Sequence, residues 1–376
     1  MMQTVPSKQR LLSLDFFRGL TVAAMILVNN PGDWSHIYAP FAHAAWNSCT
    51  PTDLIFPFFL FIVGVSIVFA MSSAKQDSNN HPKLIKSILK RSLTLFVLGL
   101  LLSLFPFFNF AEVRIPGVLQ RIAIVYLISG LLFIKVDSKA LFRIFIVILL
   151  SYWLIMTFVP VPGFGPANLG KETNLGAWLD RLIFTEAHVW KSAKTWDPEG
   201  LLTTLPAIAT GLFGVLIGLV LKSNLKTQET KVAWLFTYGF IAFLLGLFWD
   251  TFFPINKSLW TSSYVLYTGG LASMVLGLCY WIIDVQGFTK FTKPFVVYGV
   301  NAITVFFASG IIARSMSLIK ITVNGDLVSL KQYLYQTFFT PYLSSYDASL
   351  AGAITFVLIW YLVLWMMYRK NIIIKV

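Results

Sequence analysis

Apolar runs about 20 residues long recur along the chain, separated by short polar segments. About 20 helical residues are needed to cross the hydrocarbon core of a bilayer. The alternating ten-residue pattern of membrane barrel strands is absent from the sequence. We therefore predict an all-α fold, a polytopic membrane helical bundle forming one domain over residues 1–376. The ten predicted spans are residues 12–30, 53–72, 86–105, 117–134, 140–159, 200–221, 232–250, 261–283, 295–314 and 349–368.

The distribution of basic residues predicts the orientation of this bundle. Of the 29 Lys and Arg residues, 18 fall in alternate inter-span segments, nine fall in the others, and Arg18 and Arg121 lie inside spans. Cytoplasmic loops of membrane proteins carry the excess of Lys and Arg. Both termini should therefore face the cytoplasm, and the first helix should be retained because no small-residue cleavage site follows it.

The overall composition supports a membrane protein and excludes a nucleic-acid partner. Charged residues make up 12% of the chain, against about 25% in soluble domains. The formal charge of +13 is explained by the cytoplasmic loops, so we expect the lipid bilayer and no nucleic acid as a partner. Cys49 and Cys279 fall on opposite predicted sides, which argues against a disulfide and against a metal site.

Two outward segments, residues 160–199 and 315–348, are long, and they are rich in aromatic and polar residues. Long segments without regular structure usually serve as lids or binding loops, or are disordered. Their aromatic content argues against disorder. We expect irregular loops that contribute to a binding site.

The first predicted span carries two ionisable residues, Asp15 and Arg18, three positions apart on one helical face. Ionisable groups at bilayer depth cost at least a few kcal/mol each, so they tend to be paired and functional. One interpretation is a structural ion pair. The other is that Arg18 binds an anion in a polar cavity. Arg121, inside the fourth span, also requires an anionic partner or water.

The loop between the first two spans contains a candidate general base. Thr50, Pro51 and Asp53 fit a capping box at the start of the second span. We expect Asp53 also to orient His43, ten residues earlier, because His is the usual base near neutral pH. His36 and His188 are rivals that these residues alone do not exclude.

Further polar groups gather at the outer ends of several spans. Asn29 closes the first helix, either as a cap or as a catalytic donor. The segment from Asp197 has the pattern of a helix cap, with Pro198 at the first helical position. Arg114 precedes the fourth span, and Lys257 precedes the eighth. A shared polar pocket at these ends explains the pattern better than separate coincidences do.

Seven motifs in order resemble the heparan-α-glucosaminide N-acetyltransferase family, including its bacterial members. They are RLLSLDFFRG, VNN, HAAWNSCTPTDLIFPFFLFIVG, RIPGVLQRIA, DPEGLL, NKSLWTSSYV and GVNAI. The resemblance covers almost the whole chain. The sequence departs from the family pattern at NSCT, where NGLT is usual, and in a longer segment between Asn29 and His43.

The resemblance implies a transmembrane acetyltransferase of a bacterial cytoplasmic (inner) membrane, with residues 10–72 as its catalytic core. It takes acetyl from cytoplasmic acetyl-CoA and delivers it to the amine of a glucosamine-type sugar on the outer side. The family's catalytic His matches His43 and its proposed catalytic Asn matches Asn29. The expected site residues are His43, Asn29 and Asp53 for catalysis; Arg18, Asp15, Arg114, Arg121 and Lys257 for acetyl-CoA; and Trp46, Asn47, Trp260 and Asn301 for the amino-sugar acceptor.

Several alternatives stay open at this point. Direct transfer in a ternary complex and a ping-pong route through acetyl-His43 are both compatible with the sequence. An O-acetyltransferase of envelope polysaccharide would use the same donor. A secondary transporter would explain intramembrane charge, although inverted repeats are missing, and a purely structural scaffold is the weakest alternative. A homodimer is also open.

Overall fold

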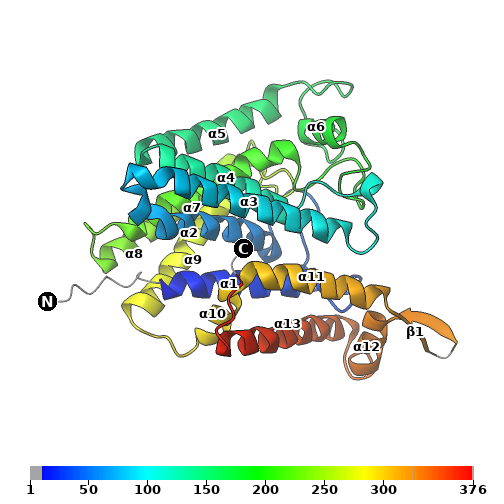
Figure 1. Ribbon diagram of the computed structural model, residues 1–376. Helices are drawn as coiled ribbons and strands as arrows, with labels where there is room; N and C mark the ends of the chain where they lie inside the picture. The colour runs from blue at the N-terminus through cyan, green and yellow to red at the C-terminus, as the bar shows by residue number, and fades with distance from the viewer. Residues whose placement is uncertain (1–10, 324, 375–376) are drawn as a thin grey trace.

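The computed structural model describes residues 11–323 and 325–374, which form a bundle of long helices (Figure 1). A small antiparallel hairpin of two strands projects from one end. The elements are α1 (Leu12–Asn29), α2 (Ile55–Lys75), α3 (His81–Leu104), α4 (Val118–Lys135), α5 (Ser138–Phe158), α6 (Leu175–Phe184), α7 (Leu201–Lys222), α8 (Gln228–Asp250), α9 (Ser262–Cys279), α10 (Lys293–Val300), α11 (Ala302–Leu318), β1 (Lys320–Val323), β2 (Asp326–Ser329), α12 (Leu330–Phe338) and α13 (Ser345–Arg369).

The predicted class, a polytopic helical membrane protein, is confirmed. Within residues 11–323 and 325–374, nine helices are long and apolar enough to cross a membrane, and the count is ten if one bent helix pair is taken as a single span. The predicted ninth span, 295–314, is wrong as a single straight helix. It consists of α10 and α11, bent by 80° at Asn301, where φ is −117° and ψ is 37°. Lys8, Arg10 and Lys375, which entered the count of basic residues, lie outside the described residues.

The two long segments expected to be irregular contain regular structure. Residues 160–199 include α6, and residues 315–348 include the end of α11, the β1–β2 hairpin and α12. Both lie at the end of the bundle where α1 finishes and α2 begins, which we call the His43 end (Figure 1). The opposite end, where α1 begins, is the Asp15 end.

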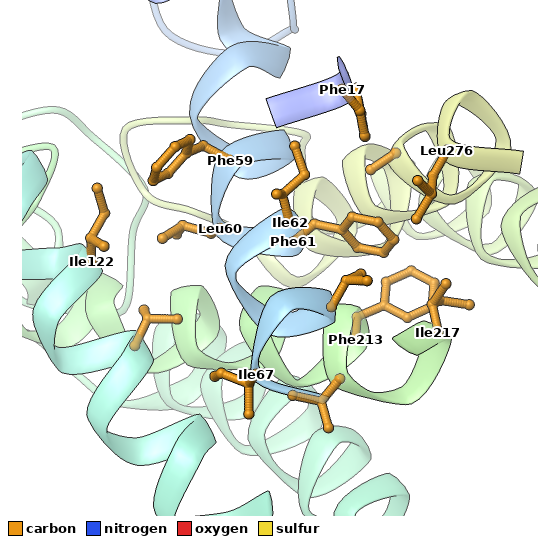
Figure 2. Packing of buried hydrophobic residues seen from close by; sticks show 14 of the residues in the cluster. Phe17, Phe59, Leu60, Phe61, Ile62, Ile67, Ile122, Phe213, Ile217 and Leu276 are labelled. Carbon is orange, nitrogen blue, oxygen red and sulfur yellow. The ribbon is translucent and has the colours of Figure 1, made fainter. Parts of the chain in front are cut away.

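Helix α2 lies at the centre of the hydrophobic core. Leu60, Phe61 and Ile62 on α2 are fully buried, and Figure 2 shows α2 surrounded by apolar side chains from α1, α4, α7 and α9. The backbone of α2 approaches α7 closely at Gly64, where a Cβ atom would lie 2.0 Å from the Gly211 carbonyl oxygen. Such small-residue contacts allow membrane helices to pack tightly.

Helix α1 is held by other elements at both of its ends. The Asp284 carboxylate, which follows α9, accepts hydrogen bonds from the backbone N–H groups of Leu12 (3.2 Å) and Ser13 (3.0 Å). These are amides that a helix cannot satisfy internally. Just beyond the other end, the Gly32 N–H donates to the Ser349 carbonyl of α13 at 3.0 Å. Helix α1 is therefore held at both ends, and both candidate sites described below lie against it.

Candidate active site

A cavity of about 630 Å³ lies at the His43 end, between the end of α1, the start of α2 and the loops before α4, α7 and α9. It contains most of the groups expected in a shared polar pocket. Its polar and aromatic lining includes Asn29, His43, Trp46, Asp53, Arg114, Lys171, Glu172, Trp190, Ser192, Trp196, Glu199, Lys257 and Ser258. This cavity, which we call the His43 cavity, brings together residues from across the sequence.

His43 and Asp53 form a hydrogen-bonded pair in this cavity. The His43 Nδ1 atom lies 2.6 Å from Asp53 Oδ1, and the Asp53 side chain is 1% exposed, against 51% for His43. The second Asp53 oxygen accepts from the backbone N–H groups of Ala44 and Thr50, both at 3.0 Å. The predicted capping box is present, so one carboxylate both caps the start of α2 and contacts the histidine.

The arrangement favours one tautomer of His43. A carboxylate accepts hydrogen bonds, so Nδ1 carries the proton that is donated to Asp53. Nε2 then keeps its lone pair, as a general base requires. The imidazole is the exposed partner of a buried, fixed carboxylate. In this tautomer the exposed imidazole has a free Nε2 lone pair, the chemical requirement for a proton acceptor.

Lys257, from the loop before α9, lies against the same pair. Its Nζ atom is 3.6 Å from Asp53 Oδ1 and 3.0 and 3.3 Å from the two ring nitrogens of His43. The two ring nitrogens of an imidazole point in diverging directions in the ring plane, so a single ammonium cannot form hydrogen bonds with both. The ionic partner of the Lys257 ammonium is the Asp53 carboxylate. Burial lowers the pKa of Lys257, and the charges of Asp53 and Glu199 offset part of that shift. Lys257, expected to bind acetyl-CoA, therefore belongs to the His43 cavity.

Arg114 anchors the loop before α7 and also lines the His43 cavity. Its guanidinium donates to Asp197 from Nε (2.8 Å) and Nη2 (2.6 Å), and to Glu199 at 2.5 Å. Burial opposes the charge, but these carboxylates hold the pKa of Arg114 above its ordinary value. Asp197 is therefore an ion-pair partner, and the prediction that it caps α7 is wrong. Asp180 caps α7 instead, accepting from the Leu201 N–H at 2.9 Å.

Asp180 and Glu199 are carboxylates that the sequence analysis did not single out. Burial raises the pKa of the Asp180 carboxyl to about 7. Glu199 lines the cavity, and its side chain is 8% exposed. For Glu199 the signal was present in the DPEGLL motif, which was interpreted only as a helix start, whereas no motif pointed to Asp180.

Two residues expected at the site lie behind it. Arg121 and Trp260 are each 1% exposed and line neither the His43 cavity nor the cavity described below. The Arg121 guanidinium lies 5.0 Å from a Trp260 ring centroid and donates to the Gly200 carbonyl and the Thr203 hydroxyl. The structure therefore places Arg121 and Trp260 in the core outside both cavities, which does not fit the ligand-binding roles expected of them.

The other residues predicted to form the site at the His43 end do not all line the same cavity. Trp46 lines the His43 cavity and donates from its indole N–H to the Leu169 carbonyl at 2.9 Å. Asn47 accepts from the Asn256 amide at 3.1 Å and lines a separate cavity, so it does not join the expected substrate group. Asn29, the last residue of α1, is exposed to the His43 cavity.

The rival histidines lie elsewhere. His36 Nδ1 lies 2.6 Å from Asp33 Oδ2, and His188 Nδ1 lies 2.8 Å from the Val113 carbonyl oxygen. Neither residue lines the His43 cavity. The geometry thus separates three histidines that the sequence left as alternatives.

A second cavity, of about 590 Å³, lies toward the Asp15 end between α1, α2, α3, α4 and the α10–α11 bend. Arg18 donates from Nη1 to Asp15 Oδ1 at 3.0 Å and from Nη2 to Ser66 Oγ at 2.7 Å. Arg91, a residue that the sequence analysis missed, lines the same cavity and lies 4.9 Å from the Tyr126 ring centroid. This cavity, which we call the Arg18 cavity, presents two guanidinium groups.

Asn301 lies at the Arg18 cavity, away from the other residues expected to bind the acceptor. Its side-chain amide donates to the Ile372 carbonyl at 3.1 Å and accepts from the Ile374 N–H at 3.0 Å. Ile373 and Ile374 form part of the cavity wall. The bend between α10 and α11 thus uses its amide to hold the segment after α13.

The two cavities lie along the same helices, about one turn apart. On α2, Phe56 lines the His43 cavity and Phe59 the Arg18 cavity; on α4, Val118 and Ile122 do the same. Residues three or four apart on a helix are neighbours on one face. The two cavities are therefore close neighbours along α2 and α4, whereas on α1 their nearest lining residues, Arg18 and Met25, are seven positions apart.

This fold and these sites define a multi-pass helical membrane protein with a histidine–carboxylate pair at one end and an arginine–carboxylate pair toward the other. A sequence model described as heparan-alpha-glucosaminide N-acetyltransferase, catalytic, matches residues 10–247. The chain belongs to this family, which confirms the resemblance inferred from the motifs.

Two curated relatives agree with this assignment. The heparan-alpha-glucosaminide N-acetyltransferase of Mus musculus is 32% identical over 353 residues, covering 80% of this chain and 53% of the relative. The protein of the same name from Homo sapiens is 32% identical over 350 residues, covering 79% and 52%. The chain therefore spans about half the length of the curated relatives it matches.

Proposed function

We propose that the protein is an acetyl-CoA-dependent acetyltransferase that acetylates the amine of a glucosamine-type sugar across a membrane. The observation that carries this proposal is the pair of cavities along α1, α2 and α4. One contains a base held by a buried carboxylate, and the other contains two guanidinium groups suited to phosphate. Family membership supports the same activity.

In the proposed reaction, the acceptor amine enters the His43 cavity. His43 Nε2 takes a proton from the acceptor nitrogen as that nitrogen attacks the thioester carbonyl carbon. The C–S bond breaks, the CoA thiolate leaves, and the amide remains on the sugar. Asn29, which lines the same cavity, would donate a hydrogen bond to the thioester oxygen, and removing one such donor typically costs about 10²–10³ in rate.

Acetyl-CoA would bind from the Asp15 end, which we assign to the cytoplasm. Its phosphates would pair with Arg18 and Arg91, and its pantetheine arm would run between α1, α2 and α4 toward His43. We assign the protein to the inner membrane of a bacterium, with the His43 end outward. The direction of transfer follows from these assignments, because a polyanionic donor does not cross lipid.

Assaying the purified protein tests the proposed activity. With acetyl-CoA and glucosamine, we expect release of CoA thiol and an N-acetylated sugar. A sugar that offers only hydroxyl groups should give neither. Transfer to hydroxyl groups alone would instead favour an O-acetyltransferase. The absence of any thioester cleavage with both acceptors would contradict the enzyme assignment.

Cysteine labelling tests the sidedness. Lys171, on the wall of the His43 cavity, and Lys331, on α12, both lie at the His43 end. Cysteines placed there should react with an impermeant thiol reagent added from outside, in a variant that lacks Cys49 and Cys279. A cysteine at Lys83, on α3 at the Asp15 end, is the matched control and should be protected. The reverse pattern would overturn the orientation.

A further inference from the structure

A third cavity, unconnected to the proposed chemistry, lies at the His43 end between α11, α12 and α13. Its volume is about 380 Å³, within the range of about 300–1,000 Å³ typical of small-molecule sites. It is lined by Asn30, Gly32, Ala313, Met316, Lys331, Leu334, Tyr335, Phe338, Phe339, Gly352, Thr355, Phe356 and Ile359. Most of these side chains are apolar or aromatic.

One face of helix α12 lines this cavity. That face is charged at its first residues and apolar along the rest of its length. Lys331 lies at the start of the helix, followed at helical spacing by Leu334, Tyr335, Phe338 and Phe339. Eight residues at about 1.5 Å rise make this face about 12 Å long. It has the shape and polarity that match an extended molecule with a polar head and an apolar tail.

The charged end carries an ammonium that lacks an ionic partner. Among residues 11–323 and 325–374, no hydrogen bond or ion pair to Lys331 Nζ is present. Burial lowers its pKa, opposed by the charge of Asp33. Asp33 itself binds His36 Nδ1 at 2.6 Å and the Ser35 N–H at 2.9 Å. An anion bound in the cavity would therefore supply the negative charge that the described residues do not place against the Lys331 ammonium.

The surroundings of the cavity are those of a lipid-facing surface. Helix α13 and the α10–α11 pair are candidate membrane spans. Ile312 on α11, Phe338 on α12 and Ile359 on α13 are 45%, 62% and 53% exposed. Large exposed apolar side chains on spanning helices are covered by lipid rather than by water. A ligand that reaches the cavity laterally would come from the bilayer.

We propose that this cavity binds a membrane phospholipid. The lipid phosphate pairs with Lys331, and one acyl chain lies along the apolar face of α12 between α11 and α13. Asn30 and Gly32 line the same cavity, so the bound lipid packs against the end of α1 that carries Asn29. The site is independent of the acetyl-transfer activity proposed above.

The first test separates the head group from the tail. Delipidated protein in detergent is mixed with phosphatidylglycerol, with diacylglycerol of the same chains, or with glycerol phosphate, and binding is measured by native mass spectrometry and by thermal unfolding. Phosphatidylglycerol should bind and raise the unfolding midpoint. Diacylglycerol should bind at least about tenfold more weakly, since a charge-assisted contact is lost, and glycerol phosphate should not bind detectably. Equal binding of the two lipids, or full binding of glycerol phosphate, would overturn the proposal.

Variants locate the site. Lys331→Gln should weaken phosphatidylglycerol binding about tenfold, and Lys331→Arg should retain it, which also controls for folding. Lys320→Gln, on the exposed strand β1, is the matched control and should bind as the unmodified protein does. Ala313→Phe should fill the cavity and abolish binding of both lipids. Unchanged binding in Lys331→Gln or in Ala313→Phe contradicts the assignment.

Discussion

Replacing His43 with Ala should lower the rate of acetyl transfer by at least about 100-fold, the lower end of what acid–base catalysis contributes. His43 is the histidine that lies in the cavity with Asn29 and Glu199, and its Nδ1 atom is held by the buried Asp53. Acetyl-CoA binding should be nearly unchanged, because Arg18 and Arg91 line a different cavity. Steady-state transfer rates and equilibrium binding of CoA are the two measurements.

His36→Ala is the matched control for this substitution. His36 also contacts an aspartate at 2.6 Å and belongs to the same loop, but it lies outside the His43 cavity. Its variant should keep most of the activity. Near-normal turnover in His43→Ala together with loss in His36→Ala would assign the base to the other histidine.

Removing either member of the Asp15–Arg18 pair should destabilise the protein, by less than the roughly 3–5 kcal/mol seen when a fully buried pair is broken, because both residues line an open cavity. The Asp15 and Arg18 side chains are 11% and 23% exposed. Arg18→Ala should also weaken acetyl-CoA binding, because it removes a cation proposed to meet phosphate. Asp15→Ala should destabilise similarly and leave that cation in place.

The double Ala variant distinguishes the two interpretations of the pair. If Arg18 binds phosphate, the double variant regains much of the stability but still binds acetyl-CoA weakly. If the pair is only structural, both stability and affinity recover. Thermal unfolding and CoA affinity are measured on all three variants. A double variant with the affinity of the unmodified protein would remove Arg18 from the donor site.

The local features of the fold were predictable because they depend on nearby residues. A run of about 20 apolar residues defines a span, the spacing of Asp15 and Arg18 places them on one helical face, and the Thr50–Asp53 capping box needs four residues. The match to GVNAI did not indicate that Asn301 breaks a helix. At that break the Asn301 side chain donates to the segment after α13, some 70 positions away, a contact that no local motif encodes.

The composition of the site was less predictable, because side chains from distant segments decide which cavity a residue faces. Arg121 and Trp260 carry the same chemical groups as Arg114 and Trp46, yet they pack against each other in the core. Their positions in the sequence place all four residues near the same end of the bundle. The sequence does not show which of them line the cavity and which are buried behind its lining. That distinction comes from packing.

Helix α1 joins the two proposed sites mechanically, since Arg18 and Asn29 stand eleven residues apart on one helix, about 16 Å. Its ends are held by Asp284 and by the contact of Gly32 with Ser349. If acetyl-CoA binds at Arg18 and the acceptor at Asn29, as proposed, a shift of α1 on donor binding would be felt at the acceptor site. By thermodynamic reciprocity the acceptor must change donor affinity by the same factor. Any cooperativity between the two substrates would therefore involve α1 together with α2 and α4, which line both cavities.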